Sequence, residues 1–463
     1  MIKKHKKPKV FDFDLLIIGS GPGGGVAAHL AANANKRVGL IEQGDPGGAN
    51  AFYGTIPTRA LLDAANQLWQ LKTIGKYGIR SSTQSYNFRA VQLWKQKAMY
   101  ATGVLEESDV FSHDKITLIK GRAHFVSPWT LSVGMKRYSA KNIIIATGSV
   151  PVIPAIPGLD EAGFLTVKEA SNLEKPPRSI FIIGGGKIAY EYSQIFSAFD
   201  SRVHIAETSS SLIHHADEEV NDGAVWALEG KGIRVHLKTQ IMSVAMHGGR
   251  KIISLVKNDR MHRIVVEQIL IAGEEHPALD MGLENSGVNY GPKGIRVNDF
   301  LQTNKKHIYA IGSVIGKHSE PHTASAEARL VIHNIYAKKP IKYPFDVSPT
   351  IYYGTPEIAV VGKNEQTLRQ ISKKYQVGIA PIELIGSART NDYSGGFVKL
   401  LTSKEGVIEG AAIISSHASE NISELSLSVN SKIQAKALTA IPHPYSSESS
   451  AIQIAAAQIT SAD

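Results

Sequence analysis

A glycine pattern at the junction of an apolar run and an alanine-rich run limits what this chain can fold into. The run FDFDLLIIGS continues as GPGGGVAAHLAANA, and Gly19, Gly21 and Gly24 form G-x-G-x-x-G at the junction. The first glycine permits a tight turn, the second lets a phosphate approach the backbone, and the third lets a helix pack closely on a strand. The pattern predicts a strand, a turn and a helix whose free N–H groups bind a dinucleotide.

An acidic residue follows this unit at the expected distance. The next apolar run, RVGLIE, ends in Glu42, which is 18 residues after Gly24. At this place a dinucleotide-binding unit has the carboxylate that binds the ribose of the adenosine. The order of strand, glycine turn, helix, strand and acid therefore favours a dinucleotide site over an accidental glycine-rich turn.

The same arrangement occurs a second time. SIFIIG is followed by GGKIAYEYSQIFSAF and then by SRVHIAE, so that Gly184, Gly186 and Ala189 repeat the glycine pattern. Glu207 ends the second strand, again 18 residues after the third small residue. Two such units in one chain predict two cofactors, a tightly held flavin nucleotide and an exchangeable nicotinamide nucleotide.

The second acid indicates which nicotinamide nucleotide is preferred. A carboxylate at Glu207 favours the free 2′-hydroxyl of NAD(H) and repels the 2′-phosphate of NADP(H). Arg202 and His204 lie close enough in the sequence to weaken this preference. We therefore expect NAD(H), with NADP(H) as the less favoured ligand.

Length and charge set further bounds. At 463 residues the chain is long enough for three or four structural units, and 51 Lys and Arg against 41 Asp and Glu give it a formal charge of +10. Part of the positive charge is in the first ten residues, at Lys3, Lys4, Lys6, Lys7 and Lys9. No aromatic or amphipathic pattern accompanies these lysines, so a solvated tail over residues 1–10 is favoured over a nucleic-acid or membrane-binding arm.

The chain contains no cysteine. This excludes disulfides, iron–sulfur clusters, thiolate zinc sites and a cysteine nucleophile. The histidines, including His214 and His215, have no acid at ligand spacing on a recognisable helix, and we expect no metal site. There is no stretch of about 18 apolar residues and no signal-peptide pattern, so we expect a cytoplasmic protein without membrane insertion.

Several further segments resemble one enzyme family in their order along the chain. IIIATGS (Ile143 to Ser149) resembles the strand that closes a flavin domain, and PVIPAIPGLD after it resembles the crossover into an NAD domain. HIYAIGSV (His307 to Val314) and PHTASAEAR (Pro321 to Arg329) resemble the second flavin-contact motif and its helix, and TIYYGTPEIAVVG opens an interface domain with the signature HPYSSE (His443 to Glu448). The chain thus resembles the class I FAD-dependent pyridine nucleotide–disulfide oxidoreductases, which include dihydrolipoamide dehydrogenase, glutathione reductase, mercuric reductase and soluble transhydrogenase.

The resemblance implies the fold class and the partners. It implies an α/β protein with two Rossmann-like dinucleotide-binding domains and an α+β C-terminal dimerisation domain. The expected FAD-binding domain spans residues 11–150 and 280–345, the NAD-binding domain 151–279 and the dimerisation domain 346–463. A homodimer with FAD, NAD(H) and a small-molecule electron acceptor follows, without nucleic acid. The resemblance adds further cofactor-binding residues: Gly48, Ala123, Thr147, Gly148, Gly273, Gly312 and Ser313.

The stretch GGANAFYGTIPTR departs from the family at its most important positions. Asn50 and Thr55 stand where the family has two redox-active cysteines. Neither side chain carries electrons, forms a mixed disulfide or makes a thiolate–flavin pair, so reduction of lipoamide, glutathione or Hg(II) by the family mechanism is excluded. Soluble transhydrogenases resemble this chain in the Gly-Thr-Ile-Pro run, with threonine at the second thiol position.

Two other departures concern the cofactors. Ser313 replaces an aspartate of the family that would hydrogen-bond the ribityl chain of the flavin, and a hydroxyl makes that bond with less charge assistance. Glu274 and Glu275 follow Gly273 where the family usually has Gly-Arg-x-Pro. An acidic pair at this place disfavours NADP(H) further.

The resemblance also implies four catalytic residues. Arg59 takes the place of a lysine that pairs with a glutamate beside the flavin, and Glu191 stands at the position of that glutamate; the alternative for Arg59 is a surface residue. His443 and Glu448 match an acid–base pair that reaches the active site of the other subunit. Their spacing, broken by Pro444, suits a geometry in which Glu448 supports the imidazole ring. The alternative is a structural His443 that hydrogen-bonds a carbonyl.

Together these features predict an FAD-dependent NADH oxidoreductase that is similar to dihydrolipoamide dehydrogenase in fold. It would pass electrons from the flavin directly to a non-disulfide acceptor such as a quinone, oxygen or a dye. Flavin-mediated transhydrogenation between two nicotinamide nucleotides is the first alternative. A catalytically inactive dimer that serves as a binding or scaffold protein is the second.

Overall fold

The structure is a computed structural model that describes residues 7–80, 85–102, 113–317, 320–343, 347–391 and 395–460. Most of the predicted basic tail, residues 1–6, lies outside this part of the chain. The chain forms two compact units, which are described separately. The first consists of Met1–Pro57, Leu93–Val152 and Glu274–Pro344, and the second of Thr58–Gln92, Ile153–Gly273 and Phe345–Asp463.

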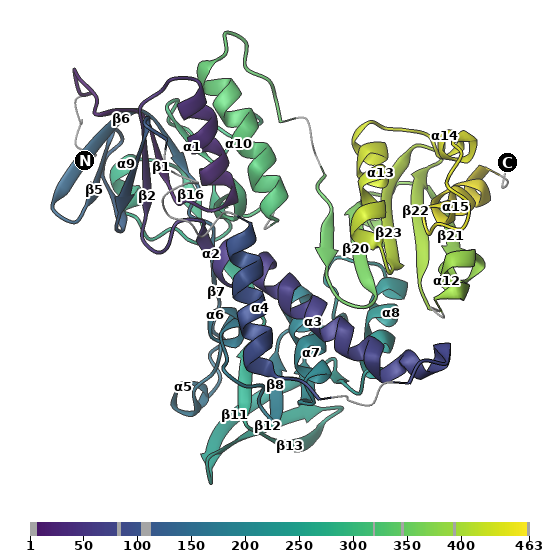
Figure 1. Ribbon diagram of the computed structural model, residues 1–463. Coiled ribbons are helices and arrows are strands. Elements are labelled where there is room, and N and C mark those ends of the chain that lie inside the picture. Colours follow the sequence, from purple (N-terminus) through teal and green to yellow (C-terminus); the bar gives the residue numbers. More distant parts are fainter. Residues whose placement is uncertain are drawn as a thin grey trace. The chain divides into compact units, whose positions relative to one another are not determined.

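A mixed sheet forms the centre of the first unit (Figure 1). Its strands are β1 (Phe13–Ile18), β2 (Val38–Glu42), β3 (Ile116–Lys120), β4 (Ala123–Ser127), β5 (Thr130–Val133), β6 (Lys136–Ile145) and β18 (Ile308–Ala310). The order is β3-β2-β1-β6-β5-β4, and β18 pairs with β6. The strands β1, β2, β3, β6 and β18 pair in parallel, whereas β4 and β5 are antiparallel. The parallel strands are apolar runs because helices cover them.

Two helices of the first unit, α1 (Pro22–Asn33) and α10 (Pro321–Tyr336), lie side by side (Figure 1). They approach closely because small residues face the contact: a Cβ on Gly23 would lie 3.1 Å from the carbonyl oxygen of Ala324. The other elements of this unit are α2 (Gly48–Phe52), β7 (Ser149–Pro151), β15 (Glu275–Pro277), α9 (Leu283–Ser286), β16 (Tyr290–Gly291), β17 (Gly294–Ile295) and the 3-10 helix η2 (Gly312–Ile315).

The second unit contains a parallel sheet around the second glycine pattern. Its strands run in the order β10-β9-β8-β14, with β8 (Ser179–Ile183), β9 (Arg202–Ala206), β10 (Arg234–His236) and β14 (Gln268–Ile271). The helices of this part are α5 (Leu159–Ala162), α6 (Val167–Ser171), α7 (Gly186–Ala198) and α8 (Glu218–Glu229). An antiparallel sheet of β11 (Gln240–His247), β12 (Arg250–Lys257) and β13 (Arg260–Val266) is separate from it.

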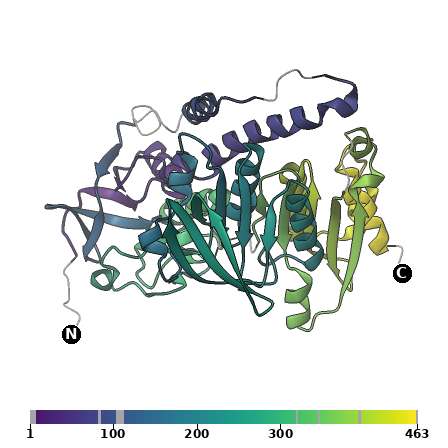
Figure 2. The same cartoon turned by 90° about the horizontal axis from the view of Figure 1, so that it is seen from below.

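The C-terminal part of the second unit has a five-stranded antiparallel sheet in the order β19-β20-β23-β22-β21. The strands are β19 (Thr350–Tyr352), β20 (Glu357–Gly362), β21 (Tyr375–Pro381), β22 (Phe397–Ser403) and β23 (Ile408–Ser415). Figure 2 shows the yellow C-terminal helices beside these strands. The helical elements are α11 (Glu365–Gln370), η3 (Ile382–Leu384), α12 (Gly386–Thr390), α13 (Ala418–Asn430), α14 (Ala435–Ala440) and α15 (Ser450–Thr460).

Two helices contain residues of both units. They are α3 (Thr55–Thr73) and α4 (Phe88–Ala101), and the 3-10 helix η1 (Ile74–Tyr77) follows α3. In consequence the segment Thr58–Gln92, which we expected in the FAD-binding domain, groups with the second unit. Among the described residues, no helix has both the length and the apolar composition that crossing a membrane requires.

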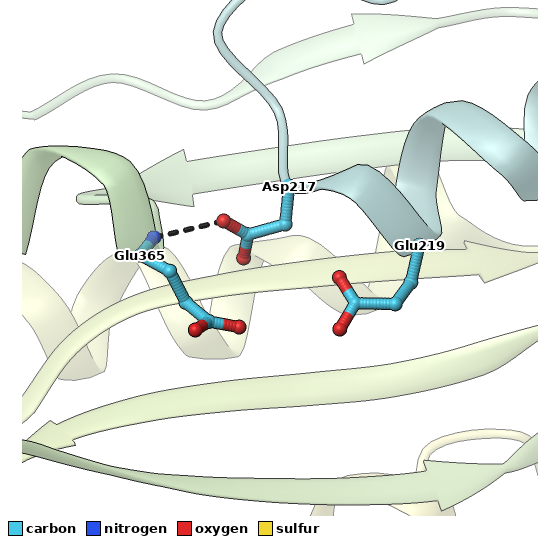
Figure 3. A group of neighbouring side chains, drawn as sticks. All are labelled: Asp217, Glu219 and Glu365. Carbon is cyan, nitrogen blue, oxygen red and sulfur yellow. Dashed lines mark hydrogen bonds between the residues drawn. The ribbon is translucent and has the colours of Figure 1, made fainter.

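The buried ammonium group of Lys399 connects the C-terminal five-stranded sheet of the second unit with the part that contains the parallel sheet. Lys399 on β22 has a side chain that is 1% exposed, and its Nζ lies 3.0 Å from Asp217, 3.1 Å from Glu219 and 2.5 Å from Glu365. Although burial alone would lower the pKa of Lys399, the hydrogen bonds to Glu365 and Asp217 raise it above its ordinary value. Figure 3 shows the three acids, with the Glu365 N–H donating to Asp217 (2.8 Å). Within the described ranges, this is the group of carboxylates whose spacing suits a metal ion, and Lys399 supplies the positive charge.

We predict that Lys399→Met destabilises the fold strongly. The change leaves the buried carboxylate of Asp217 without its ammonium partner, whereas Glu365 keeps Arg369, and loss of a buried partner costs about 3 to 5 kcal/mol of the free energy of unfolding. Chemical denaturation followed by circular dichroism measures the effect. The matched control is Lys363→Met, because the Lys363 side chain is 39% exposed and its partner Glu409 keeps a second lysine. The control should change stability by less than about 1 kcal/mol, and equal losses in both variants would contradict the prediction.

Candidate functional site

The first glycine turn leaves no room for side chains at two positions and open space at a third. Gly19 has a φ of +96°, and a Cβ there would lie 2.4 Å from the carbonyl oxygen of Ala146. A Cβ on Gly24 would lie 1.9 Å from the Gly19 carbonyl oxygen, whereas no described atom comes within 4 Å of a Cβ on Gly21. The close contacts fix the start of α1 against β1, and the open side at Gly21 fits a pyrophosphate that approaches the N–H groups.

The acid at the end of β2 is tied to this turn. One carboxylate oxygen of Glu42 accepts hydrogen bonds from the N–H (2.9 Å) and the hydroxyl (2.7 Å) of Ser20, and the other accepts from the N–H of Gly44 (2.8 Å). The hydroxyl of Ser20 in turn accepts from the N–H of Gly47 (2.9 Å). These bonds hold the Glu42 carboxylate beside the glycine turn, where a ribose would be bound. Sequence reasoning missed Ser20, the residue inside the glycine pattern that makes these bonds.

Two further predicted residues lie beside the same turn. A Cβ on Gly48 would be 2.9 Å from the Cα of Gly21, so α2 begins directly against the glycine pattern. The N–H of Gly121 donates to the Glu42 carbonyl oxygen (2.8 Å), which brings the start of β4, and with it the buried Ala123, beside the end of β2. The residues predicted to bind the adenosine part of FAD therefore lie together around the first glycine turn.

The other predicted FAD residues lie at the ends of β6 and β18. The hydroxyl of Thr147 donates to the carbonyl oxygen of Ala278 (2.8 Å). Gly148 and Gly312 have φ of +70° and +73°, a conformation that glycine adopts without strain. Ser313 follows in η2. Because β18 pairs with β6 in parallel, both strands present these residues at the same edge of the sheet.

Sequence reasoning missed a buried acid at this edge. Glu327 on α10 is 1% exposed and accepts a hydrogen bond from the N–H of Gly312 (2.6 Å). Burial raises the pKa of Glu327 to about 7, although the bond from Gly312 and the charge of Lys317 oppose the shift. The carboxyl group fixes the backbone just before Ser313 and exchanges its proton near neutral pH. The sequence did contain a signal for Glu327, because it is an acid in the helical segment PHTASAEAR that follows the second flavin-contact motif.

The second glycine turn repeats the geometry of the first. Gly184 has a φ of +103°, and a Cβ there would lie 2.8 Å from the Cα of Gly273. No described atom lies within 4 Å of a Cβ on Gly186 or on Gly273, and Ala189 is fully buried in α7. The turn therefore combines tight packing of α7 with an open side at Gly186 and Gly273, which fits a second dinucleotide.

The acid of the second unit is held ionised. Glu207 is 7% exposed and accepts hydrogen bonds from the N–H of Ser209 (2.7 Å) and the hydroxyl of Thr208 (3.1 Å), and His214 lies 3.4 Å away. Burial alone would raise the pKa of Glu207, but the contacts with His214 and Ser209 lower it to about 2. A charged carboxylate at this place suits a free ribose hydroxyl and repels a phosphate.

The two basic residues that weakened the NAD(H) preference lie apart from this carboxylate. Arg202 begins β9 and Glu207 follows its end, a separation of about 16 Å along an extended strand. His204 Nδ1 lies 3.1 Å from His236 Nε2, and burial together with His236 lowers the pKa of His204 to about 4. His204 is therefore neutral at pH 7, and neither residue provides a charge beside Glu207.

The predicted pair of Arg59 and Glu191 is not formed. The Nη1 of Arg59 instead donates to Glu357 (2.9 Å), and its guanidinium lies 4.5 Å from the ring centroid of Tyr353. Glu191, which is 4% exposed, accepts a hydrogen bond from the N–H of Tyr353 (3.0 Å). A planar guanidinium stacks on an aromatic ring more readily than a lysine ammonium does. Arg59 accordingly stacks on Tyr353 and binds Glu357. Arg59 and Glu191 are thus neighbours through Tyr353 and not partners.

The predicted support of His443 by Glu448 is also wrong within this chain. The His443 side chain is 4% exposed; its Nε2 is bonded to Glu424 (3.3 Å) and its Nδ1 to the carbonyl oxygen of Ile441 (3.0 Å). Glu448 instead accepts a hydrogen bond from the N–H of His417 (3.1 Å), and the Nδ1 of His417 lies 3.3 Å from the same oxygen. The chain from Pro444 to Glu448 therefore points the carboxylate at the start of α13. Spacing along the sequence did not determine the partner.

The positions of the two missing thiols lie in consecutive helices, one in the middle of α2 and one at the start of α3. Asn50 belongs to α2, and Thr55 is the first residue of α3. The Oδ1 of Asn50 is buried and has no hydrogen-bond partner among the described residues. The amide of Asn50 and the hydroxyl of Thr55 replace the two sulfur atoms. The segment therefore keeps the backbone of the redox motif but cannot perform its thiol chemistry.

Comparisons with known proteins agree with this geometry. The family model described as pyridine nucleotide-disulphide oxidoreductase matches residues 13–328, and the model of the dimerisation domain of the same family matches residues 348–456. The chain belongs to this family. Members are FAD-dependent oxidoreductases that use NAD(P)H, which confirms the predicted fold class and cofactors, and the dimerisation domain supports the predicted homodimer.

Individual relatives cover nearly the whole chain. A dihydrolipoyl dehydrogenase of Bacillus subtilis (strain 168) is 30% identical over 428 residues, which are 91% of this chain and 93% of the relative. A mercuric reductase of Staphylococcus aureus is 28% identical over 451 residues, 96% of this chain and 82% of the relative. The HOCl-induced flavoprotein disulfide reductase RclA from Escherichia coli, solved as a Cu(II) complex, has the same fold, with a TM-score of 0.86, 23% identity, and coverage of 97% of this chain and 100% of that one.

We predict that Gly21→Ala weakens FAD binding without harming the fold of the cofactor-free protein. The added methyl group meets no protein atom within 4 Å but occupies the side from which the pyrophosphate approaches. Equilibrium dialysis should show FAD affinity reduced by at least about tenfold, which corresponds to 1.4 kcal/mol. Gly24→Ala is the control, because its methyl group collides with the Gly19 oxygen and lowers stability. Unchanged FAD affinity in Gly21→Ala would contradict the site.

Proposed function

We propose that this protein is an FAD-dependent NADH oxidoreductase that gives electrons directly to a small acceptor other than a disulfide. A quinone, molecular oxygen or a dye fits this description. The observation that carries the proposal is the combination of two intact dinucleotide turns with a complete lack of cysteine. Family membership supports the oxidoreductase chemistry, and the missing thiols remove the usual acceptor. Its cytoplasmic location stays a prediction from the sequence.

The first unit would hold FAD through its own backbone. The N–H groups at the start of α1 would bind the pyrophosphate beside Gly21, and Glu42 would bind the adenosine ribose. The hydroxyl of Ser313 would donate to the ribityl chain, with Glu327 fixing the backbone before it. FAD held there would supply the two-electron redox chemistry that connects NADH with the acceptor.

The second unit would select NADH. The start of α7 at Gly186 takes the pyrophosphate, and the carboxylate of Glu207 accepts hydrogen bonds from the ribose hydroxyls. The depressed pKa of Glu207 keeps it charged throughout the physiological range, which disfavours the 2′-phosphate of NADPH. The neutral state of His204 removes a charge that would have attracted that phosphate.

Following the family resemblance, Arg59 and Glu191 would contribute to the redox reaction by charge. Arg59 is kept positive and oriented by Glu357, and a fixed cation at this place stabilises negative charge that develops on a bound ring. Glu191 holds the backbone of Tyr353, the ring on which the Arg59 guanidinium stacks. Both residues would therefore position charge and shape and need no thiol partner.

Transhydrogenation is a second candidate, favoured by Thr55. The Gly-Thr-Ile-Pro run that contains it resembles soluble transhydrogenases, and two nicotinamide nucleotides can exchange a hydride through one flavin. In that case NAD+ or its thio analogue would be the acceptor. The first proposal is preferred because it accepts any small oxidant that reaches the flavin.

We predict that the FAD-loaded protein oxidises NADH with menadione or ferricyanide and not with oxidised lipoamide. Stopped-flow and steady-state absorbance at 340 nm measure NADH consumption with each acceptor. Thiol-alkylating reagents should leave the rates unchanged, because the chain has no cysteine. A dihydrolipoyl dehydrogenase treated in parallel is the control, since its lipoamide activity requires thiols.

Three results would overturn the proposal. Turnover with lipoamide at a rate comparable to menadione would contradict the exclusion of disulfides. Turnover with thio-NAD+ alone would establish the transhydrogenase. A lack of turnover with every acceptor, with FAD bound, would establish the inactive scaffold.

A further inference from the structure

Two histidines lie side by side on the parallel sheet of the second unit. The rings of His204 on β9 and His236 on β10 are stacked, with centroids 5.4 Å apart and planes that differ by 6°. His204 Nδ1 lies 3.1 Å from His236 Nε2, so one ring donates its N–H to the other while both are neutral. The proposed function assigns no role to this pair.

The pair lies on the face of the sheet that is opposite to the dinucleotide site. Phe181 on β8 is the register partner of His204, and it packs in an apolar cluster with residues of β11, β12 and β13. Ile205 points the other way and packs in the cluster that contains α7. The carboxylate of Glu207 is also on the α7 side, since a Cβ on Gly185 would lie 2.9 Å from it. The histidines therefore face the antiparallel sheet.

The antiparallel sheet is apolar at its centre and basic at one end. Ile253 and Leu255 of β12 are buried against the parallel sheet. Lys257 is two residues after Leu255, and side chains two residues apart in a strand point to the same face. His262 of β13 is the register partner of Leu255 and shares that face. Burial lowers the pKa of His236, and the neighbouring Lys257, Arg234 and His262 lower it further.

No carboxylate offsets the positive charge around the two histidines. Burial lowers the pKa of His204 to about 4, and His236, Arg234 and Arg202 contribute to the shift. Acids are absent from the causes of the pKa shift of either ring. In the described parts of the chain, Arg202, Arg234 and Lys257 form no ion pair with an acid.

Two cations stand directly opposite each other at the same end. Lys257 of β12 and Arg260 of β13 are register partners across the antiparallel ladder. Like charges in this position destabilise a sheet. Asp259, in the turn between them, is not among the groups that shift the pKa of either histidine. A bound anion would remove the repulsion between the cations.

Basic side chains from four strands form this end of the two sheets, which we call the basic edge: Arg202 and His204 of β9, Arg234 and His236 of β10, Lys257 of β12, and Arg260 and His262 of β13. We propose that the basic edge binds a multivalent phosphate anion from solution. Guanidinium groups and imidazole N–H groups suit phosphate oxygens, to which they donate charge-assisted hydrogen bonds. A free anion is favoured over a lipid surface because both histidines are partly buried on the face that the antiparallel sheet covers.

The two histidines make this binding depend on pH. In the free protein, burial and the neighbouring cations lower the pKa of both rings. A phosphate group offsets these cations, so the pKa of a ring rises toward its ordinary value of about 6.5 in the complex. A group whose pKa is higher in the complex takes up a proton on binding. The affinity for the anion should therefore increase as the pH falls from about 8 to about 6.

Isothermal titration calorimetry of the FAD-loaded protein with inorganic tripolyphosphate tests the proposal. Saturating NAD+ is present, so that both glycine turns are occupied. We expect binding that is tighter at pH 6 than at pH 8, with heats that differ between buffers of different ionisation enthalpy, which reports proton uptake. Arg234→Gln and Lys257→Gln should each raise the Kd about tenfold, because each removes a charge-assisted contact. His236→Gln should lower the number of protons taken up, which a purely structural role would leave unchanged.

Arg250→Gln is the matched control. Arg250 begins β12 and is exposed; it lies about 23 Å along the strand from Lys257 and points to the other face. Its substitution should leave the Kd for tripolyphosphate unchanged. An equal rise in Kd for Arg250→Gln and Lys257→Gln would show attraction by net charge alone and overturn the site.

Two further results would contradict the proposal. The first is a lack of tripolyphosphate binding at pH 6. The second is sedimentation of the protein with phosphatidylglycerol vesicles when it does not bind tripolyphosphate, which would identify a lipid surface as the ligand. Binding of tripolyphosphate that Arg234→Gln and Lys257→Gln weaken, without sedimentation of the protein with the vesicles, would confirm a site for a free anion.

Discussion

The structure depends on close packing between the start of a helix and the glycine turn before it, which occurs in both dinucleotide-binding units. A Cβ added at Gly24 would lie 1.9 Å from the carbonyl oxygen of Gly19, and a Cβ added at Gly184 would lie 2.8 Å from the Cα of Gly273. Because neither place has room for a side chain, α1 and α7 begin directly at the ends of β1 and β8. Their free N–H groups then lie open beside Gly21 and Gly186. Both cofactor sites, and therefore any redox function, depend on this packing.

Several residues that the family resemblance implies to be catalytic have partners that the sequence did not predict. In the second unit, Glu357 ties Arg59 to the start of α13, and Glu448 turns to His417. Each buried carboxylate retains at least one donor, as burial of charge requires. The network can therefore persist without a dithiol, provided that the acceptor reacts with the flavin itself.

The sequence predicted local features well and long-range partners poorly. The two dinucleotide units and the position of Glu207 follow from short spacings, because strand, turn, helix and strand are consecutive and their geometry is fixed by backbone sterics. Arg59 and Glu357 are 298 residues apart, and no spacing rule connects them. Glu448 was expected at His443, five residues away, but the packing of the start of α13 brings His417 closer. Which carboxylate a side chain meets is decided by tertiary packing, and a single sequence contains little information on it.

The central claim is that this chain delivers electrons from NADH through its flavin without any thiol. The most direct measurement is an anaerobic titration of the FAD-loaded protein with NADH, followed by the visible spectrum. We predict that flavin absorbance is lost at about one NADH per FAD, with no long-wavelength absorption from a thiolate–flavin pair. Uptake of a second equivalent, or flavin absorbance that NADH leaves unchanged, would contradict the claim.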